Sequence, residues 1–310
     1  MGEWHLDDKV VQVKATQAFG TVLTAMVTPF TADSTKIDFD AAAQLANDLV
    51  DLGNNGLVVN GTTGESPTTH EHEKLELLKV VIDAVGERAR VIAGAGSNDT
   101  VHSVLLAKDA AQAGAHGLLV VTPYYSKPPQ DGIYAHMVAV ADSTDLPVMV
   151  YDIPGRTGVA ISNDTMLQLS EHPRILANKD AKGDIWAASQ VMSKSDLAYY
   201  SGDDPLNLAL LAIGAVGVVS VTGHVVADRH KKMVEAIQNN DVQTARKINE
   251  TLVPITEGIM TRAGGAIMVK AALDLLNRAG GGSLRLPLVP ATPDQRKVLK
   301  ADLIRGGFSL

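Results

Sequence analysis

The stretch RVIAGAGSNDTVHSVLLAKDAAQAGAHGLLVVT (90–122) decides the fold of this chain. It opens with an apolar run, RVIAGAG (90–96), and closes with a second one, GLLVVT (117–122). The segment between them, TVHSVLLAKDAAQAGA (100–115), has apolar residues at helical spacing. Continuous apolar strands that alternate with helices are typical of parallel sheets buried on both faces. The stretch therefore predicts a strand, a helix and a second, parallel strand.

The same pattern recurs along most of the chain. Helical spacing also marks EHEKLELLKVVIDAVGE (71–87) and SNDTMLQLSEH (162–172), where Asn163 or Asp164 could cap the helix. Eight strands that alternate with helices predict an α/β fold, the (β/α)8 TIM barrel, and a doubly wound open sheet is the alternative. The six further strand-like runs are TVLTAMV (21–27), GLVVN (56–60), PVMVYD (147–152), ILANK (175–179), LAYYSG (197–202) and GVVSV (217–221).

Beyond residue 240 the pattern changes from alternation to helices alone. VQTARKINETLVPITEGIM (242–260) and GAIMVKAALDLLNRAG (265–280) have helical character, and GGGSLRLPLVPATPDQ (280–295) separates them from a last helix. We therefore expect an N-terminal extension at 1–19, a catalytic barrel at 20–240 and a small C-terminal helical region at 241–310.

Composition excludes several classes of protein. Among 310 residues the net charge is −8 and no long basic run occurs, so neither a nucleic acid nor an anionic membrane is an expected partner. The absence of cysteine excludes disulfides, thiolate catalysis and cysteine-rich metal sites. Residues 1–20 lack the apolar core of a secretory signal, and no apolar run reaches membrane-spanning length. These features predict a soluble cytoplasmic protein with a short polar leader.

Polar residues follow several of the predicted strands, where a barrel carries its chemistry. NGTTGESP (60–67) could receive a carboxylate on threonine hydroxyls and backbone N–H groups, or could form a structural turn. TPYYSKPP (122–129) holds the adjacent Tyr124 and Tyr125, of which one could enter the site. YDIPGRTG (151–158) presents Arg156, which could bind a carboxylate or pair with Asp152.

Lys179 ends the sixth strand, in ILANKDAKGD (175–184). Alternation places Ile175, Ala177 and Lys179 on one face, whereas a surface lysine on an edge strand is the alternative. Small residues in SGDD (201–204) and SVTGH (220–224) leave room for a ligand at the last two strand ends. A partly desolvated amine beside tyrosine hydroxyls suits imine chemistry with a ketone.

The motifs at these strand ends resemble those of the dihydrodipicolinate synthase family, within the pyruvate-dependent class I aldolase and lyase superfamily. The resemblance runs from about Gly20 to the C-terminus and rests on GTTGESP, TPYYSKPP, YDIPGRTG, KDAKGD, YYSGDD and GVVSV, in family order. It implies a lyase that condenses pyruvate with L-aspartate 4-semialdehyde into 4-hydroxy-tetrahydrodipicolinate, on the diaminopimelate route to lysine.

The resemblance also implies which residues act in catalysis. Lys179, and not Lys182, would form the Schiff base with pyruvate. Tyr151 would shuttle protons in a hydroxyl relay with Thr62 and Tyr125, and Tyr125 would reach into the site of the neighbouring subunit. A homotetramer built from tight dimers is implied, without a metal or an organic cofactor.

Substrate-binding residues follow from the same motifs. Thr62 and Thr63 would bind the pyruvate carboxylate, and Arg156 would bind the carboxylate of the semialdehyde. Gly202 and the backbone carbonyl of Val219 would line the pocket near the lysine. Asn178 departs from the family pattern, which has an aliphatic residue before the lysine; alternation turns it toward the helical layer, where a buried amide needs partners.

Other functions fit less of the sequence. N-acetylneuraminate lyase and keto-deoxy sugar-acid aldolases share the lysine, the tyrosine and the threonine loop, but differ after the fifth strand, where this chain has Arg156. A non-catalytic ligand-binding barrel is expected to lose the lysine or the tyrosine. GAGSND (94–99) lacks the third glycine of a dinucleotide site, and HEHE (70–73) lacks zinc-helix spacing and is interpreted as a solvated first turn.

Feedback inhibition by L-lysine is not expected. Lysine-inhibited relatives bind the ligand at the dimer interface. Alignment with their pattern places Glu71 and Lys74 at the histidine positions and His102 at the position of a glutamate. Asn98 and Tyr124 match the pattern. Lys74 would repel the ammonium of the ligand, and His102 removes the carboxylate that would pair with it. The alternative is that a shifted helix supplies His70 or His72 as a substitute.

Overall fold

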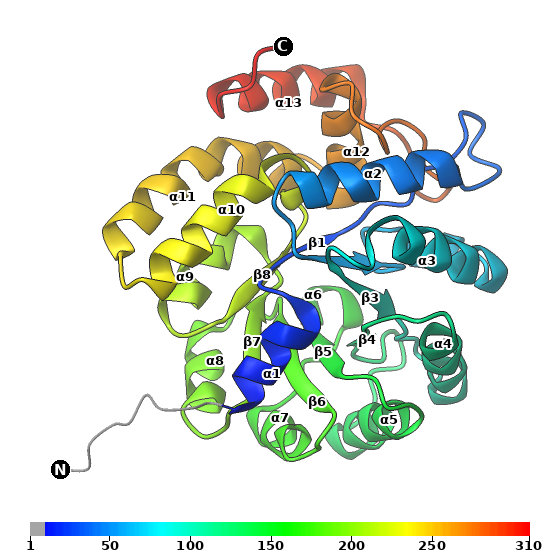
Figure 1. Cartoon of the computed structure of the whole chain (residues 1–310), viewed down its shortest axis with the longest axis vertical. Coiled ribbons are helices and arrows are strands. Elements are labelled where there is room, and N and C mark those ends of the chain that lie inside the picture. The colour runs from blue at the N-terminus through cyan, green and yellow to red at the C-terminus, as the bar shows by residue number, and fades with distance from the viewer. Residues whose placement is uncertain (1–9) are drawn as a thin grey trace.

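The computed structural model describes residues 10–310, and its centre is a closed barrel of eight parallel strands in chain order (Figure 1). Each strand pairs with the next along the chain, and the first pairs with the last, which confirms the (β/α)8 barrel over the open sheet. The strands are β1 (Val22–Ala25), β2 (Gly56–Val59), β3 (Arg90–Gly94), β4 (Gly117–Val121), β5 (Val148–Asp152), β6 (Ile175–Asp180), β7 (Ala198–Ser201) and β8 (Gly217–Ser220).

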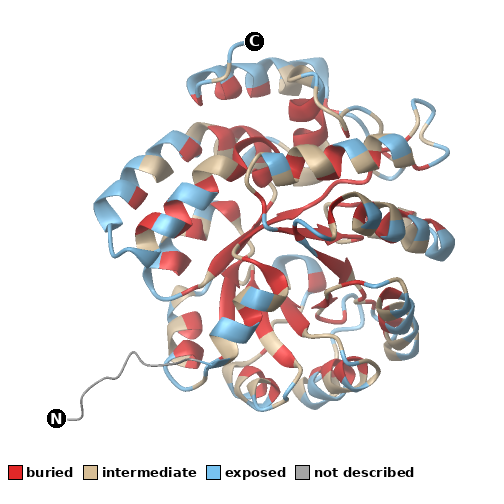
Figure 2. Cartoon of the chain, viewed as in Figure 1, coloured by how far each residue is buried: buried red, intermediate tan, exposed pale blue. Residues whose placement is uncertain are grey.

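Helices surround the barrel and turn one face toward it, so that the strands are buried on both sides (Figure 2). Most are the crossover connections that parallel strands require. The α-helices are α1 (Val10–Phe19), α2 (Phe39–Asp51), α3 (Glu71–Val85), α4 (Thr100–Gln112), α5 (Gln130–Asp142), α6 (Pro154–Thr157), α7 (Asn163–Ser170), α8 (Ile185–Met192), α9 (Asn207–Ala212), α10 (Gly223–Gln238), α11 (Val242–Thr256), α12 (Gly265–Leu275) and α13 (Pro293–Arg305). Single turns of tighter or wider helix are η1 (Ser66–Thr68), η2 (Asp204–Leu206) and η3 (Glu257–Thr261).

Helix starts follow local hydrogen-bonding chemistry, with one difference from the sequence expectation. The cap of α7 is Ser162, whose hydroxyl accepts the Thr165 N–H at 3.2 Å, and Asn163 and Asp164 lie in the first turn. A serine in an extended conformation directly before the helix can accept a hydrogen bond from one of the free N–H groups of the first turn, whereas Asn163 and Asp164 already lie inside the helix.

Two apolar clusters correspond to the two faces of the sheet. The larger cluster lies between the strands and the helices, and the smaller fills the barrel interior. Alternation along each strand explains the division, because successive side chains point to opposite faces. Residues of the interior cluster that come from the strands are Leu23, Ala25, Val58, Ile92, Leu119, Met149, Tyr151, Ala177, Ala198, Tyr200 and Val219.

Strand β6 departs from simple alternation at its start. Val148 pairs with Ile175 and Met149 pairs with Ala177, so Leu176 is an extra residue in the register. Ile175 therefore belongs to the outer cluster, whereas Ala177 belongs to the interior one. The expectation that Ile175 and Ala177 share a face was wrong, because a bulge inserts one residue and reverses the parity before it.

Helix α1 closes the amino-terminal end of the barrel, a role that the expected polar leader did not include. Phe19 is fully buried, and its ring meets the Tyr200 ring edge to face with centroids 6.3 Å apart. The Tyr200 hydroxyl donates to the carbonyl of Gly20 at 2.8 Å. Gly56 and Gly117 leave room for the helix, because an added Cβ would lie 2.4 Å from the Phe19 oxygen and 2.6 Å from its ring, respectively. Residues 1–9 of the expected extension lie outside the described residues.

After α10 the chain continues as helices alone. Helix α11 packs on α10, and α13 packs on α11 and α12 at the edge of the molecule (Figure 1). The division into residues 1–19, 20–240 and 241–310 stays a prediction. Within residues 10–310, no helix combines the length and the apolar character needed to cross a membrane.

Replacing Phe19 with alanine tests the role of α1. Removing a fully buried phenylalanine leaves a cavity under Tyr200, so we expect the free energy of unfolding to fall by about 3–5 kcal/mol. Val13→Ala on the same helix is the control, because Val13 is 53% exposed and its loss is expected to change stability by no more than about 0.5 kcal/mol. Urea unfolding followed by circular dichroism measures both; equal stabilities of the two variants would contradict this packing.

Candidate functional site

A cavity of about 400 Å³ opens at the carboxyl ends of the strands. It is lined by residues of the segments that follow β2, β3, β4 and β5, including Thr62, Ser97, Tyr124, Tyr151 and Arg156. This is the end at which a parallel barrel positions its chemistry, because the loops after the strands converge there. Three of the predicted site residues therefore lie around one space.

Lys179 lies in the barrel interior beside that cavity. It pairs in register with Tyr151 on one side and Tyr200 on the other, and its Nζ lies 4.0 Å from the centroid of the Tyr151 ring. Burial lowers the pKa of Lys179 to about 7, which the charge of Asp204 partly opposes. About half of the amine is therefore neutral and nucleophilic near neutral pH.

The Tyr151 ring lies against the amine and also lines the cavity. Burial raises the pKa of Tyr151 to about 12, so the phenol is protonated across the physiological range. A neutral phenol can donate a proton to a developing oxyanion and take it back, which a phenolate cannot.

The threonine loop after β2 is fixed from the barrel side. The Thr28 hydroxyl donates to the Gly64 carbonyl at 2.6 Å, and an added Cβ at Gly64 would lie 3.0 Å from the Met26 oxygen. Thr62 lines the cavity, whereas Thr63 lies next to it in the chain but is not part of the lining. A side chain larger than that of glycine would be crowded at the back of the loop.

Arg156 lies on the short helix α6 with its side chain exposed. The alternative partner, Asp152, is buried and accepts the Ile161 N–H at 3.2 Å. No carboxylate among residues 10–310 lies within ion-pair distance of Arg156. Its guanidinium at the cavity wall is therefore free to bind an anionic group.

Gly202 lies against the side chain of Lys179, and Val219 lies on β8. An added Cβ at Gly202 would lie 2.7 Å from Lys179 Cγ and 2.9 Å from its Cε, so glycine is required for the lysine to lie in this rotamer. Val219 is buried in the interior cluster and pairs with Leu23.

Tyr125 does not join this group within its own chain. Its side chain is 88% exposed, and its φ of 71° is unusual for a residue other than glycine. Tyr124, and not Tyr125, lines the cavity. Within its own chain, Tyr125 therefore lies apart from the cavity.

Sequence reasoning missed a carboxylate beneath the site. Asp204 is buried and accepts four hydrogen bonds: from the Ser220 hydroxyl at 2.5 Å, the Val221 and Thr222 N–H groups at 2.8 and 2.9 Å, and the Asn207 amide at 2.9 Å. These bonds tie the end of β8 to η2. The signal in the sequence is the SGDD motif (201–204), which places a carboxylate directly after a strand.

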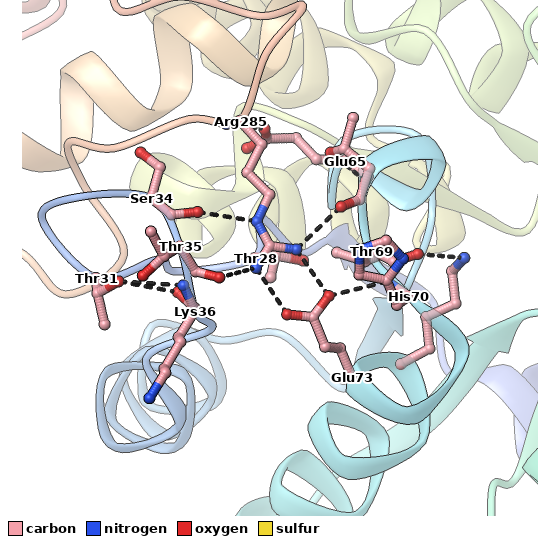
Figure 3. Close-up of polar contacts among 12 residues, drawn as sticks. Thr28, Thr31, Ser34, Thr35, Lys36, Glu65, Thr69, His70, Glu73 and Arg285 are labelled. Carbon is pink, nitrogen blue, oxygen red and sulfur yellow. Dashed lines mark hydrogen bonds and ion pairs between the residues drawn. The ribbon is translucent and has the colours of Figure 1, made fainter.

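Two sequence motifs have structural roles that their patterns did not reveal. Added Cβ atoms at Gly94 and Gly96 would lie 2.4 Å from the Asn60 oxygen and the Val121 nitrogen, so these glycines allow neighbouring strand ends to approach closely. The first turn of α3 is not fully solvated as expected, because Glu73 is buried and forms an ion pair with Arg285 (Figure 3). Among residues 10–310, no three His, Cys, Asp or Glu side chains are grouped so that they could hold a metal.

The outer faces of β5 and β6 carry acids behind the catalytic candidates. Asp152 and Asp180 pair in register and are both buried. Burial raises the pKa of Asp152 to about 7 and raises that of Asp180. Lys182 lies on this side, and its ammonium donates to the Ile161 carbonyl at 3.1 Å, away from the cavity.

Asn178 also faces outward and hydrogen-bonds the Tyr199 side chain, but its Oδ1 finds no partner within residues 10–310.

Comparison with known proteins gives consistent results. The profile of the Dihydrodipicolinate synthetase family matches residues 18–305. The chain is 56% identical over 292 residues to 4-hydroxy-tetrahydrodipicolinate synthase 2 of Streptomyces coelicolor, covering 94% of this chain and 97% of that protein.

Solved structures agree in fold as well as in sequence. Dihydrodipicolinate synthase from Cyanidioschyzon merolae, solved with lysine bound, is 40% identical with a TM-score of 0.90, covering 94% of this chain and 99% of that one. The chloride-inhibited enzyme from Acinetobacter baumannii, complexed with pyruvate, is 34% identical with a TM-score of 0.89, covering 93% and 98%. With a family match across nearly its whole length, the chain belongs to the dihydrodipicolinate synthetase family.

Proposed function

We propose that this protein condenses pyruvate with L-aspartate 4-semialdehyde through a lysine Schiff base to give 4-hydroxy-tetrahydrodipicolinate. The observation that carries the proposal is the buried amine of Lys179 against Tyr151, at the edge of a cavity that Thr62 and Arg156 line. Relatives at 55–58% identity named 4-hydroxy-tetrahydrodipicolinate synthase favour this activity over sialic-acid or sugar-acid cleavage.

Lys179 begins the reaction as the nucleophile. Its neutral amine attacks the ketone carbon of pyruvate, and loss of water leaves a protonated imine. The imine withdraws electrons from the neighbouring methyl group, which loses a proton to give an enamine. The enamine carbon then attacks the aldehyde, and the amino group of the second substrate displaces Lys179 as the ring closes.

The surrounding residues bind the two substrates and transfer protons. Thr62 and Thr63 hold the pyruvate carboxylate, and Tyr151 passes protons along a relay with Thr62 and Tyr125. Arg156, which has no carboxylate partner among residues 10–310, binds the carboxylate of the semialdehyde at the cavity wall. Gly202 and the Val219 carbonyl complete the pocket around the lysine. The cytoplasm is the compartment in which we expect this chemistry.

The proposed active unit is a tight dimer within a homotetramer. Support comes from Tyr125, a large aromatic side chain that is 88% exposed on a backbone with positive φ. Such a conformation costs on the order of 1–3 kcal/mol and persists where other contacts hold it. A second subunit that receives the Tyr125 ring would supply those contacts.

Trapping with borohydride tests the function directly. We expect reduction in the presence of pyruvate to fix one adduct on the peptide that contains Lys179, and Lys179→Ala to abolish it. Because only the neutral amine attacks, the rate of adduct formation should rise as the pH rises through about 7, the pKa of Lys179. Lys182→Ala is the control and should trap pyruvate normally; an adduct on Lys182, or none, would refute the mechanism.

Mixing inactive subunits tests the shared site. Tyr125→Phe and Lys179→Ala homo-oligomers should each be inactive, and exchange of their subunits should restore activity, since one site of each mixed dimer then has both native residues. Native mass spectrometry confirms the exchange. If activity stays absent despite exchange, Tyr125 acts in its own chain or not at all.

L-Lysine should leave activity essentially unchanged at millimolar concentration. Lys74 and His102 line the same cavity as Tyr124, and Lys74 places its ammonium 2.9 Å from the Thr69 carbonyl. A cation at this wall repels the ammonium of the ligand. Calorimetry and a steady-state assay at subsaturating pyruvate measure the effect, with the Cyanidioschyzon merolae protein as the positive control for binding. Inhibition at low millimolar lysine would show that other side chains bind it.

A further inference from the structure

Four charged residues from distant parts of the chain meet behind the threonine loop. Figure 3 shows three of them, Glu65, Glu73 and Arg285. Glu65 ends that loop, Glu73 lies in the first turn of α3, Lys270 lies on α12 and Arg285 lies in the segment before α13. We call these four residues the clamp. None of them lines the cavity or was expected to act in catalysis.

The Glu65–Lys270 pair is almost completely removed from solvent. Lys270 Nζ lies 2.6 Å from Glu65 Oε1, and both side chains are 1% exposed. The same ammonium donates to the Ser283 carbonyl at 2.7 Å and lies 4.3 Å from the centroid of the Phe30 ring. The second carboxylate oxygen of Glu65 accepts the Arg285 N–H at 3.0 Å. Residues of the C-terminal helical region thus use both oxygens of Glu65.

Arg285 uses all five of its guanidinium N–H groups. Two go to the carboxylate of Glu73, each at 2.7 Å, in the bidentate geometry that only arginine offers. The other three go to backbone carbonyls of Ser34, Thr35 and Thr68 at 3.0, 2.9 and 2.9 Å. Arg285 therefore connects the loop after β1, the start of α3 and, through its own N–H, Glu65.

Glu65 is tied as closely to the threonines as to the clamp. Its φ is 56°, in the left-handed region, and its N–H donates to the Thr62 carbonyl at 3.1 Å. The next residue, Ser66, donates its N–H to the Gly61 carbonyl at 3.3 Å. A movement of Glu65 therefore displaces Thr62 and Thr63, because the backbone hydrogen bonds close the loop on itself.

We propose that Lys270 and Arg285 are positioning residues that hold the threonine loop, through Glu65, in the conformation that receives the pyruvate carboxylate. The inference rests on the proposed function, and it gives the C-terminal helical region a part in substrate binding although no residue of that region touches the cavity.

Stability alone is a weak reason for this arrangement. Replacing a buried ion pair with apolar residues of similar volume is often neutral or stabilising, because two charges must be desolvated. Such a pair does select one geometry, since every alternative conformation leaves a buried charge without its partner. A loop that must present a hydroxyl and backbone N–H groups to a small carboxylate benefits from that selection, because small displacements of binding groups weaken catalysis steeply.

The double variant Glu65→Gln/Lys270→Met tests the proposal. It removes both charges together, so neither charge is left buried without its counter-ion, and the fold is expected to persist. We expect the pyruvate concentration for half-maximal trapping, and the KM for pyruvate, to rise about 10-fold or more, while the KM for the semialdehyde changes less than about 2-fold.

A matched control removes another ion pair of the same helix. Asp274 on α12 pairs with Arg296 on α13 at 2.6 Å, and both side chains are partly exposed. Asp274→Asn/Arg296→Met should leave the KM for pyruvate unchanged. A merely structural role for the clamp would instead lower stability in the double variant without separating the two KM values.

Hydrogen exchange on the unaltered protein provides a second measurement that does not depend on a variant folding. If the loop and the C-terminal segment are coupled, pyruvate bound at the loop must stabilise the contacts of that segment in return. The backbone N–H of Arg285 donates a hydrogen bond to Glu65. Imine formation should therefore slow hydrogen exchange at this N–H and leave the peptide around Arg296 unaffected.

Two results would overturn the proposal: an unchanged pyruvate dependence in a folded double variant, or unchanged exchange at Arg285 on imine formation. Failure of the proposed function looks different, because the unaltered protein would then trap no pyruvate at Lys179 at all.

Discussion

An ammonium group that is buried away from water loses hydration energy, which favours its neutral form. The chemistry of this site depends on the burial of one such group, that of Lys179. Lys179 extends into the interior of a closed barrel, where neighbouring strands, the Tyr151 ring and Gly202 surround it. The low pKa of the amine is thus a property of the whole barrel. The register of each strand decides which side chains fill the interior, and these side chains exclude water from the amine.

Two buried lysines show how partners decide what a desolvated amine does. Lys270 has the Glu65 carboxylate at 2.6 Å, which opposes the lowering of its pKa by burial and gives it a structural partner. Lys179 forms no ion pair within residues 10–310, and Asp204 acts on it only from a distance. The four hydrogen bonds that Asp204 accepts keep its carboxylate in place beneath the site. An ion pair in direct contact fixes Lys270 in place, whereas a more distant charge raises the pKa of Lys179.

The barrel could be predicted from the sequence because its signal is local. Each strand is an apolar run and each helix has its own spacing, so eight runs required no knowledge of distant contacts. Position at a strand end likewise identified Lys179, Tyr151 and Arg156 as candidates. What could not be predicted depends on contacts far apart in the chain: Phe19 under Tyr200, and Arg285 on Glu73 across 212 positions. The sequence pattern predicted a polar leader around Phe19 and a solvated first turn around Glu73, since a charge or a polar segment shows its partner only after folding.

The bulge in β6 bears on how this strand can change in length. Leu176 is an additional residue between Ile175 and Ala177, and the register from Ala177 to Asp180 is regular on both sides. Loss of one residue before Ala177 can be absorbed by straightening the bulge, so the orientation of Lys179 is preserved. Loss of one residue between Ala177 and Lys179 has no such reserve and would turn the amine into the helical layer, beside Asp152. A one-residue deletion should therefore be tolerated before Ala177 but not between Ala177 and Lys179.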